Sequence, residues 1–68
     1  MISFEFWRNH ETGEILAVKL HNGVVVAYAG PLHHDDVDQS YLANLDYVDA
    51  GAARIEETRE LFEPLASL

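Results

Sequence analysis

The densest group of side chains that could do chemistry is the run His33-His34-Asp35-Asp36. Imidazole and carboxylate groups are suitable ligands for a divalent transition metal. Adjacent residues in a loop rarely converge on one ion, because good sites combine ligands from successive helical turns or from separate elements. We therefore interpret this run as a polar loop, keep His33, His34 and Asp35 as alternative metal ligands, and expect no cofactor.

No other pattern in the chain predicts catalysis. Asp36-Val37-Asp38-Gln39-Ser40 begins like a calcium-binding loop, but the required glycine and distal glutamate are missing. No phosphate-binding loop, dinucleotide fingerprint or nucleophile elbow is present. The chain has no cysteine, and its paired carboxylates are consecutive aspartates or exposed helical glutamates. Since glycosidase-type chemistry needs two carboxyl groups that face each other, we expect no catalytic residue and no enzyme.

Aromatic residues are better candidates for binding a partner than the polar residues are for catalysis, because Trp and Tyr bury a large apolar area at interfaces for little loss of entropy. Trp7 and Tyr28 fall on the same predicted sheet face, next to aliphatic residues. If that face is free, it is too apolar for an ordinary monomer surface. If helices cover both faces, the same residues are buried within the chain. The predicted partner-binding residues are Trp7, Ile15, Val24, Val26 and Tyr28.

The acidic residues form a second candidate surface. The formal net charge is −8 at pH 7, which argues against direct binding of nucleic acid or of an anionic membrane, since both require clustered Lys and Arg. The acidic residues are concentrated after Pro31. A solvated helix surface is the simpler explanation, and an acidic surface for a basic partner is the alternative. The candidate acidic surface consists of Asp35, Asp36, Asp38, Glu56 and Glu60.

The length of 68 residues predicts a single domain, residues 1–68, with a marginal core. Chains of this size usually need disulfides, a metal, oligomerisation or very good packing, and without cysteine the first is excluded. The N-terminus does not resemble a signal peptide, and no apolar run approaches the roughly 20 residues that span a bilayer. We expect a cytoplasmic protein.

The first half predicts a three-stranded β-meander. Ile2, Phe4 and Phe6 alternate with polar residues or Trp, which is a strand period. Turn residues at 9–13 precede a second strand at 15–20, and Asn22-Gly23 is a strong hairpin signal before a third strand at 24–29. Pro31 is expected to end the third strand.

Placing the large apolar residues together on one core face predicts the strand register. The predicted pairs are Phe6–Leu16, Phe4–Val18, Ile2–Leu20, Leu20–Val25, Val18–Ala27 and Leu16–Ala29. The opposite face then holds the predicted partner-binding residues. The third strand is expected to be an edge that lacks the usual Lys, Pro or inward charge.

The second half predicts two helices. Val37, Tyr41, Leu45 and Val48 recur at helical spacing. Asp49 is a candidate N-cap for the second helix, which Pro64 would stop near Glu63. A short strand at 46–48 is the alternative for that region. The expected fold is α+β, with a three-stranded antiparallel β-meander followed by two C-terminal helices (βββαα).

These features favour a small acidic, non-enzymatic protein-interaction module. It would form a homodimer or bind another protein through the apolar sheet face or the edge of the third strand. The alternative is an acidic regulator that occupies the basic surface of a DNA- or RNA-handling protein. A metal-dependent enzyme or sensor that uses His33, His34 and Asp35 is the third hypothesis.

Overall fold

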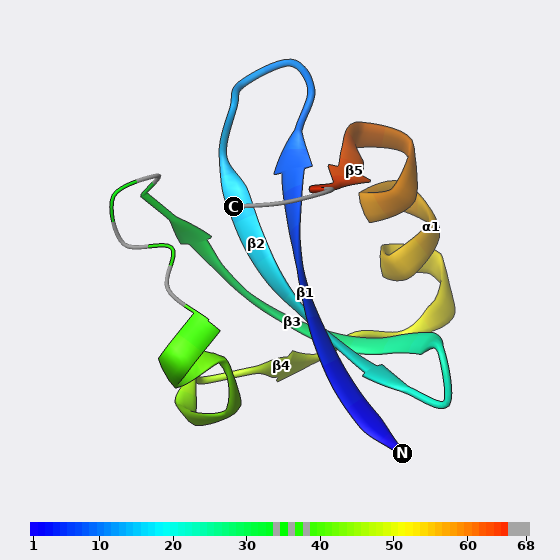
Figure 1. The fold of residues 1–68 in the computed structure, drawn as a ribbon. Helices are drawn as coiled ribbons and strands as arrows, with labels where there is room; N and C mark the ends of the chain where they lie inside the picture. The colour runs from blue at the N-terminus through cyan, green and yellow to red at the C-terminus, as the bar shows by residue number, and fades with distance from the viewer. Residues whose placement is uncertain (34, 36, 38, 66–68) are drawn as a thin grey trace.

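The computed structural model describes residues 1–33, 35, 37 and 39–65. Within them the chain forms a five-stranded antiparallel sheet in the order β4-β3-β2-β1-β5 (Figure 1). The strands are β1 (Ile2–Asn9), β2 (Ile15–His21), β3 (Val24–Leu32), β4 (Val48–Asp49) and β5 (Phe62–Pro64). The helical elements are the 3-10 helix η2 (Gln39–Asn44) and the α-helix α1 (Ala52–Leu61).

The predicted βββαα fold is wrong in its second half. The meander β1-β2-β3 is present, but the described residues contain a single α-helix, α1. The segment predicted as the first helix instead forms η2 and then β4, which pairs with the outer side of β3. The alternative of a short strand at 46–48 is closer to the structure. Helical spacing was misleading because Leu42 of η2, with Val37, Leu45 and Tyr47 from the flanking segments, packs on the sheet without a full α-helix.

The second predicted helix has different ends from those expected. Asp49 belongs to β4, and the N-cap of α1 is Gly51, which has no side-chain cap bond. The helix ends at Leu61, and Pro64 lies within β5. The Leu61 carbonyl accepts from the His10 N–H, just after β1. The Leu65 N–H donates to the Phe6 carbonyl of β1. Backbone groups alternate in direction along a strand, so the nitrogen of Pro64 lies on the outer side of β5, where a missing N–H is tolerated.

Both turns of the meander follow the local sequence signals. Asn22 and Gly23 have φ values of 52° and 81°, the pair of positive angles that a type I′ hairpin turn requires. At the first turn, the buried Asn9 side chain accepts hydrogen bonds from the backbone N–H groups of Glu11 (2.8 Å) and Thr12 (3.1 Å). The backbone N–H of Asn9 donates to the Glu14 carbonyl at 2.7 Å. Asn9 thereby fixes the geometry that joins β1 to β2.

The predicted register between β1 and β2 is wrong by one residue. Trp7 lies opposite Leu16, and Phe6 lies opposite Ala17. A shift of one residue transfers every side chain of a strand to the other face. Because β2 carries apolar residues at both even and odd positions, the apolar face of β1 could be matched to it in either register. The turn closed by Asn9 and Glu14 does so instead.

The pairing of β2 with β3 agrees with the prediction only near the hairpin turn. Leu20 lies opposite Val25 as predicted, but an irregularity follows at Lys19. Beyond it, Val18 lies opposite Tyr28 instead of Ala27, and the predicted Leu16–Ala29 pair is replaced by Ala17–Ala29. The third strand also continues through Pro31 to Leu32.

Apolar residues are buried on both faces of the sheet, as in the alternative in which both faces are covered, although the register had predicted one core face. Figure 1 shows α1 and η2 on opposite sides of the strands. The buried residues on the α1 side are Trp7, Leu16, Val18, Leu20 and Val25, with Tyr28, Ile55 and Phe62 packed against them. The buried residues on the η2 side are Phe6, Ile15, Ala17, Ala29 and Leu42. In the described residues, no helix is long and apolar enough to cross a membrane.

Candidate functional site

The predicted partner-binding residues do not form one exposed patch. Trp7 is 4% exposed and lies in the α1-side cluster, whereas Ile15 is 1% exposed and lies in the η2-side cluster. Tyr28 is partly buried on the α1 side, and Val26 is also partly buried. Only Val24, at the start of β3, is largely exposed. The face on which all five were predicted to meet depended on the wrong register.

Trp7 is held by three kinds of contact. Its indole N–H donates to the Glu5 carboxylate at 3.0 Å. The Arg59 guanidinium carbon lies 5.7 Å from the centre of its ring, within the range of a cation–π interaction. Its ring also packs in the α1-side cluster. Trp7 therefore joins β1 to α1 within the chain.

The third strand is not an open edge where β4 lies beside it. Ala27 pairs with Asp49, and Tyr28 pairs with Val48. The Ala50 N–H also donates to the Val26 carbonyl at 3.1 Å. The short strand β4 therefore covers the middle of β3, and the outer strands of the sheet are β4 and β5.

In the described residues, the first half of β1 is an uncovered stretch of edge, as long as Ala29–Leu32 at the end of β3 but without its proline. β5 pairs with Trp7–Asn9, and the Leu65 N–H donates to the Phe6 carbonyl at 2.9 Å. Among the residues that the structure describes, no strand pairs with the outer side of Ile2–Glu5. We call Ile2–Glu5 the open segment. Sequence reasoning overlooked it, although the first strand of a three-stranded meander is an edge just as the third is.

The open segment directs the backbone groups of Ile2 and Phe4 away from the sheet. The Met1 carbonyl accepts from the Asn22 N–H, so odd-numbered residues of this stretch bond toward β2. The Phe6 carbonyl instead bonds toward β5. Backbone direction alternates along a strand, and the pairing of β1 with β2 has no irregularity. The N–H and C=O groups of Ile2 and Phe4 therefore lie on the same outer side as the Phe6 carbonyl.

The side chains of the open segment differ between its two faces. Ile2 and Phe4 share the η2-side face with Phe6, and Phe4 contacts Tyr47 with 5.4 Å between ring centres. Ser3 and Glu5 lie on the α1-side face with Trp7. Ile2 is 46% exposed. The segment contains no Pro and no Lys, which are common protections of sheet edges.

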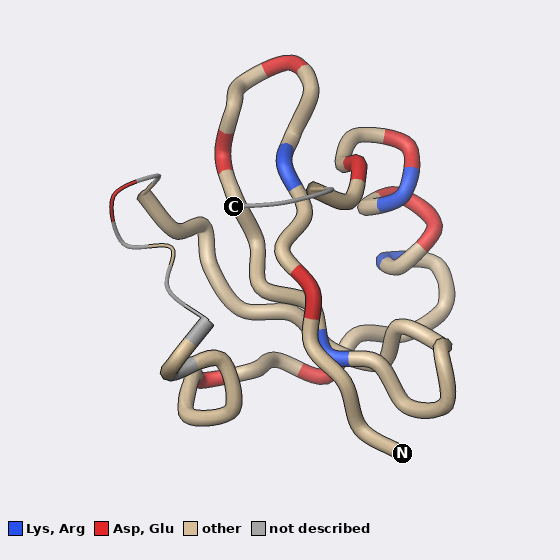
Figure 2. The backbone as a smooth tube through the Cα atoms, in the orientation of Figure 1, with Lys and Arg blue, Asp and Glu red and all other residues tan. Residues whose placement is uncertain are grey.

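The described members of the candidate acidic surface lie on different sides of the molecule. Glu56 and Glu60 belong to α1, whereas Asp35 lies in the connection between β3 and η2. Figure 2 shows the acidic residues around the whole chain, including the first turn and the end of β4. Asp36 and Asp38 lie outside the described residues.

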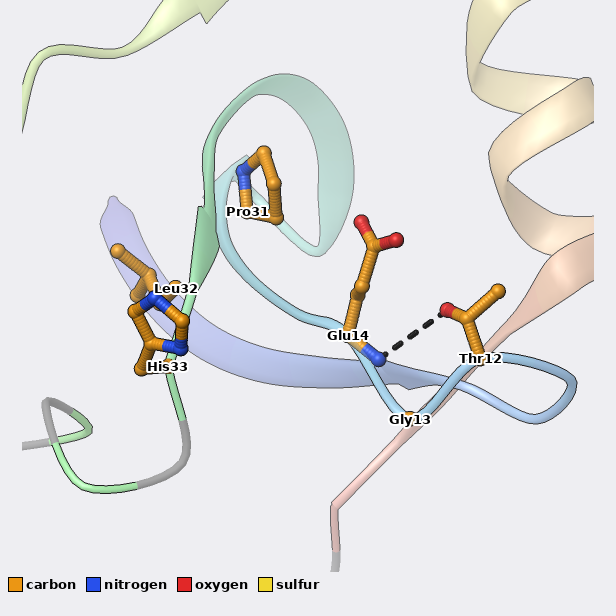
Figure 3. Close-up of a pocket in the computed structure, with 6 residues that line it drawn as sticks. All are labelled: Thr12, Gly13, Glu14, Pro31, Leu32 and His33. Carbon is orange, nitrogen blue, oxygen red and sulfur yellow. Dashed lines mark hydrogen bonds between the residues drawn. The ribbon is translucent and has the colours of Figure 1, made fainter.

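The metal-ligand candidates do not form a site in the described part of the chain. His33 and Asp35 are exposed, and no group of three or more His, Asp or Glu side chains in that part could hold a metal ion. His34 lies outside the described residues. His33 borders a hollow of about 430 Å³ together with Thr12, Gly13, Glu14, Pro31 and Leu32. The Glu14 carboxylate and the His33 ring do not converge there (Figure 3).

A second hollow, of about 230 Å³, lies between α1 and the sheet. Its charged lining residues, Arg54 and Glu57, pair with each other at 3.9 Å. The other lining residues are Leu16, Tyr28, Gly30, Pro31, Thr58, Leu61 and Phe62. Neither hollow places two carboxylates face to face or a nucleophile beside a base.

Comparisons with protein-family models, with curated proteins and with solved structures find no match to this chain. Its function therefore has to be inferred from its own geometry, in which the open segment of β1 is the clearest candidate for a binding site.

Proposed function

We propose that this protein is a non-enzymatic protein-binding module that accepts an added β-strand along the open segment of β1. The observation that carries the proposal is the outward direction of the Ile2 and Phe4 backbone groups, beside which no strand of the described chain lies. Unpaired backbone groups along a strand are a template for pairing with another chain. Strand addition of this kind is a recurrent mode of protein recognition.

The two faces of the open segment define the strand that it would accept. A side chain beside Ile2 and Phe4 meets an apolar surface, so an apolar residue fits there. A side chain beside Glu5 on the other face meets a carboxylate, so Lys, Arg or a small polar residue fits there. Alternation of apolar and polar residues is also the ordinary pattern of a strand.

The acidic-regulator alternative has less support. The described acidic residues are spread over several elements, including β1, the first turn, β4, α1 and β5 (Figure 2). Of the four carboxylates in α1 and β5, two already pair within the chain, Glu57 with Arg54 and Glu63 with Arg8. Their dispersal is typical of charges that maintain solubility. We also propose a cytoplasmic location, which the absence of cysteine supports.

A model peptide tests strand addition without knowledge of the natural partner. An acetylated and amidated hexapeptide that alternates valine and lysine supplies both required side-chain types. In an NMR titration, we expect amide shifts at Ile2–Glu5 that exceed those at β4. Ile2→Pro removes one outward N–H without removing a bond to β2, and we expect it to weaken the peptide's Kd about five- to tenfold.

Ile2→Ala is the matched control, since it truncates the side chain but keeps the N–H. We expect it to bind more tightly than Ile2→Pro. Shifts confined to the α1 hollow, or equal Kd values for wild type and Ile2→Pro, would overturn the proposal. Trp7 fluorescence reports whether each variant remains folded, because Trp7 is the single tryptophan and is buried.

A further inference from the structure

We infer that the strand accepted by the open segment is the same segment of a second copy of this chain, an inference that rests on the proposed function. The two β1 strands would run antiparallel, with Ile2 opposite Phe4 of the second copy and Ser3 at the two-fold axis. This contact is isologous, so each copy contributes the same surface.

The direction of the backbone groups determines which registers are allowed. Even-numbered residues bond outward from β1, as the Phe6–Leu65 hydrogen bond indicates. In an antiparallel contact between two such strands, an even residue must therefore lie opposite an even residue. The Ile2–Phe4 pairing meets this condition at both symmetry-related positions, where each pair exchanges both of its N–H···O bonds.

The neighbouring registers are less favourable for specific reasons. Moving the second strand by two residues toward β5 places Ile2 opposite Phe6, whose carbonyl already accepts from the Leu65 N–H at 2.9 Å. Moving it by two residues the other way leaves Ile2 opposite Ile2 and removes Phe4 from the contact. The Ile2–Phe4 register is therefore the one that uses all the outward groups of the open segment.

The side chains are compatible with this register. Each Ile2, 46% exposed in the single chain, would pack beside Phe4 of the second copy, which covers apolar surface. On the other face, Ser3 meets Ser3, and each Glu5 lies opposite the exposed Met1 of the second copy instead of a basic residue. The two Glu5 residues stand four strand positions apart. That separation is about 14 Å along the strand, beyond the Debye length of about 10 Å at 0.1 M salt. The contact therefore opposes no like charges despite a net charge of −8 per chain.

Cysteine cross-linking tests the register directly, since the chain contains no other cysteine. Ser3 would form a pair without hydrogen bonds across the axis, with its two Cα atoms about 4.5 Å apart, a separation suited to a disulfide. We expect Ser3→Cys to form a covalent dimer under mild oxidation on the order of tenfold faster than Glu5→Cys. Glu5→Cys is the matched control, because it lies on the same strand and the same face.

The cross-linking result and the peptide titration together distinguish failure of the second-copy inference from failure of the proposed function. Faster cross-linking of Ser3→Cys, abolished by adding Ile2→Pro, supports the inference. Equal rates, or faster cross-linking of Glu5→Cys, overturn this register. If wild-type protein is a monomer and Ser3→Cys does not cross-link, yet the valine–lysine peptide shifts Ile2–Glu5, the second copy is rejected while strand addition stands. If the peptide fails as well, both are rejected.

Discussion

Among the titratable residues that the structure describes, Tyr47 is the one whose environment clearly shifts its pKa. Its hydroxyl donates to the Leu42 carbonyl at 2.6 Å, and its ring packs beside Phe4. Burial raises the pKa of Tyr47 above its ordinary value of 10.0, because the phenolate loses solvation in this site. Tyr47 therefore connects the loop before β4 to β1 close to the open segment.

The raised pKa predicts a loss of stability at alkaline pH. Above about pH 10, the unfolded chain releases the Tyr47 proton while the folded chain retains it. The unfolded state then binds fewer protons, so the free energy of unfolding falls as pH rises. We expect Tyr47→Phe to cost about 1 kcal/mol near neutral pH through the lost hydrogen bond, and to lessen the alkaline loss.

Urea unfolding followed by Trp7 fluorescence measures both effects. Comparing wild type with Tyr47→Phe near neutral pH isolates the hydrogen bond, and repeating the comparison above pH 10 isolates the ionisation. An alkaline decline that is equally steep in the variant would show that Tyr47 is not responsible for it.

At the scale of elements, the sequence predicts those strands that are joined by turns with their own sequence signals. Asn22-Gly23 and the Asn9 turn carry their own geometry, so the meander follows from nearby residues. β4 and β5 have two and three residues and exist because β3 and β1 offer edges to pair with. Such short strands leave no periodic pattern, and helical spacing then predicts the wrong element.

The sequence did not predict the open segment of β1 for the same reason. Its location depends on where β4 and β5 lie along the edges of the sheet, which no local sequence pattern reveals. Trp7 was predicted to bind a partner if its face is free, or to be buried if both faces are covered, and in the structure it is buried. The one-residue error in register assigned it to the face opposite Leu16 and Val18, with which it packs. Which face a side chain occupies follows here from the Asn9 turn.

The helix α1 is attached to the sheet mainly through one side. Ile55 packs against the α1-side cluster, whereas no residue of α1 is fully buried. We expect Ile55→Ala to reduce the free energy of unfolding by about 1–2 kcal/mol, because it removes partly buried methyl groups.

Glu56→Ala is the control for that substitution. It lies next in sequence on the exposed surface of the same helix, and we expect a change within about 0.5 kcal/mol. Urea unfolding curves of the two variants provide the comparison. Equal effects would mean that α1 does not depend on Ile55 for its attachment.

At the scale of the whole molecule, charge should control self-association. Each chain carries a net charge of −8 at pH 7, so two copies repel at long range even though the proposed contact opposes no like charges. Salt screens this repulsion. We expect the mass measured by light scattering to rise toward that of a dimer between about 20 mM and 500 mM NaCl.

A foreign basic partner would behave in the opposite way, because salt screens attraction as well. The same series with the valine–lysine peptide should therefore show weaker binding at high salt. A mass that falls as salt is added would contradict apolar and backbone pairing between two copies.

The most direct measurement is amide hydrogen exchange at Phe4 as a function of protein concentration. Its N–H faces outward from the open segment, beside which no described strand lies, so we expect it to exchange freely in a single chain and to be protected when a second β1 strand bonds to it. We predict exchange that slows on the order of tenfold or more as concentration rises and the dimer fills, while the Trp7 amide, on the β2 side of the same strand, stays unchanged. Equally fast exchange of Phe4 at all concentrations would contradict pairing of the open segment with a second copy.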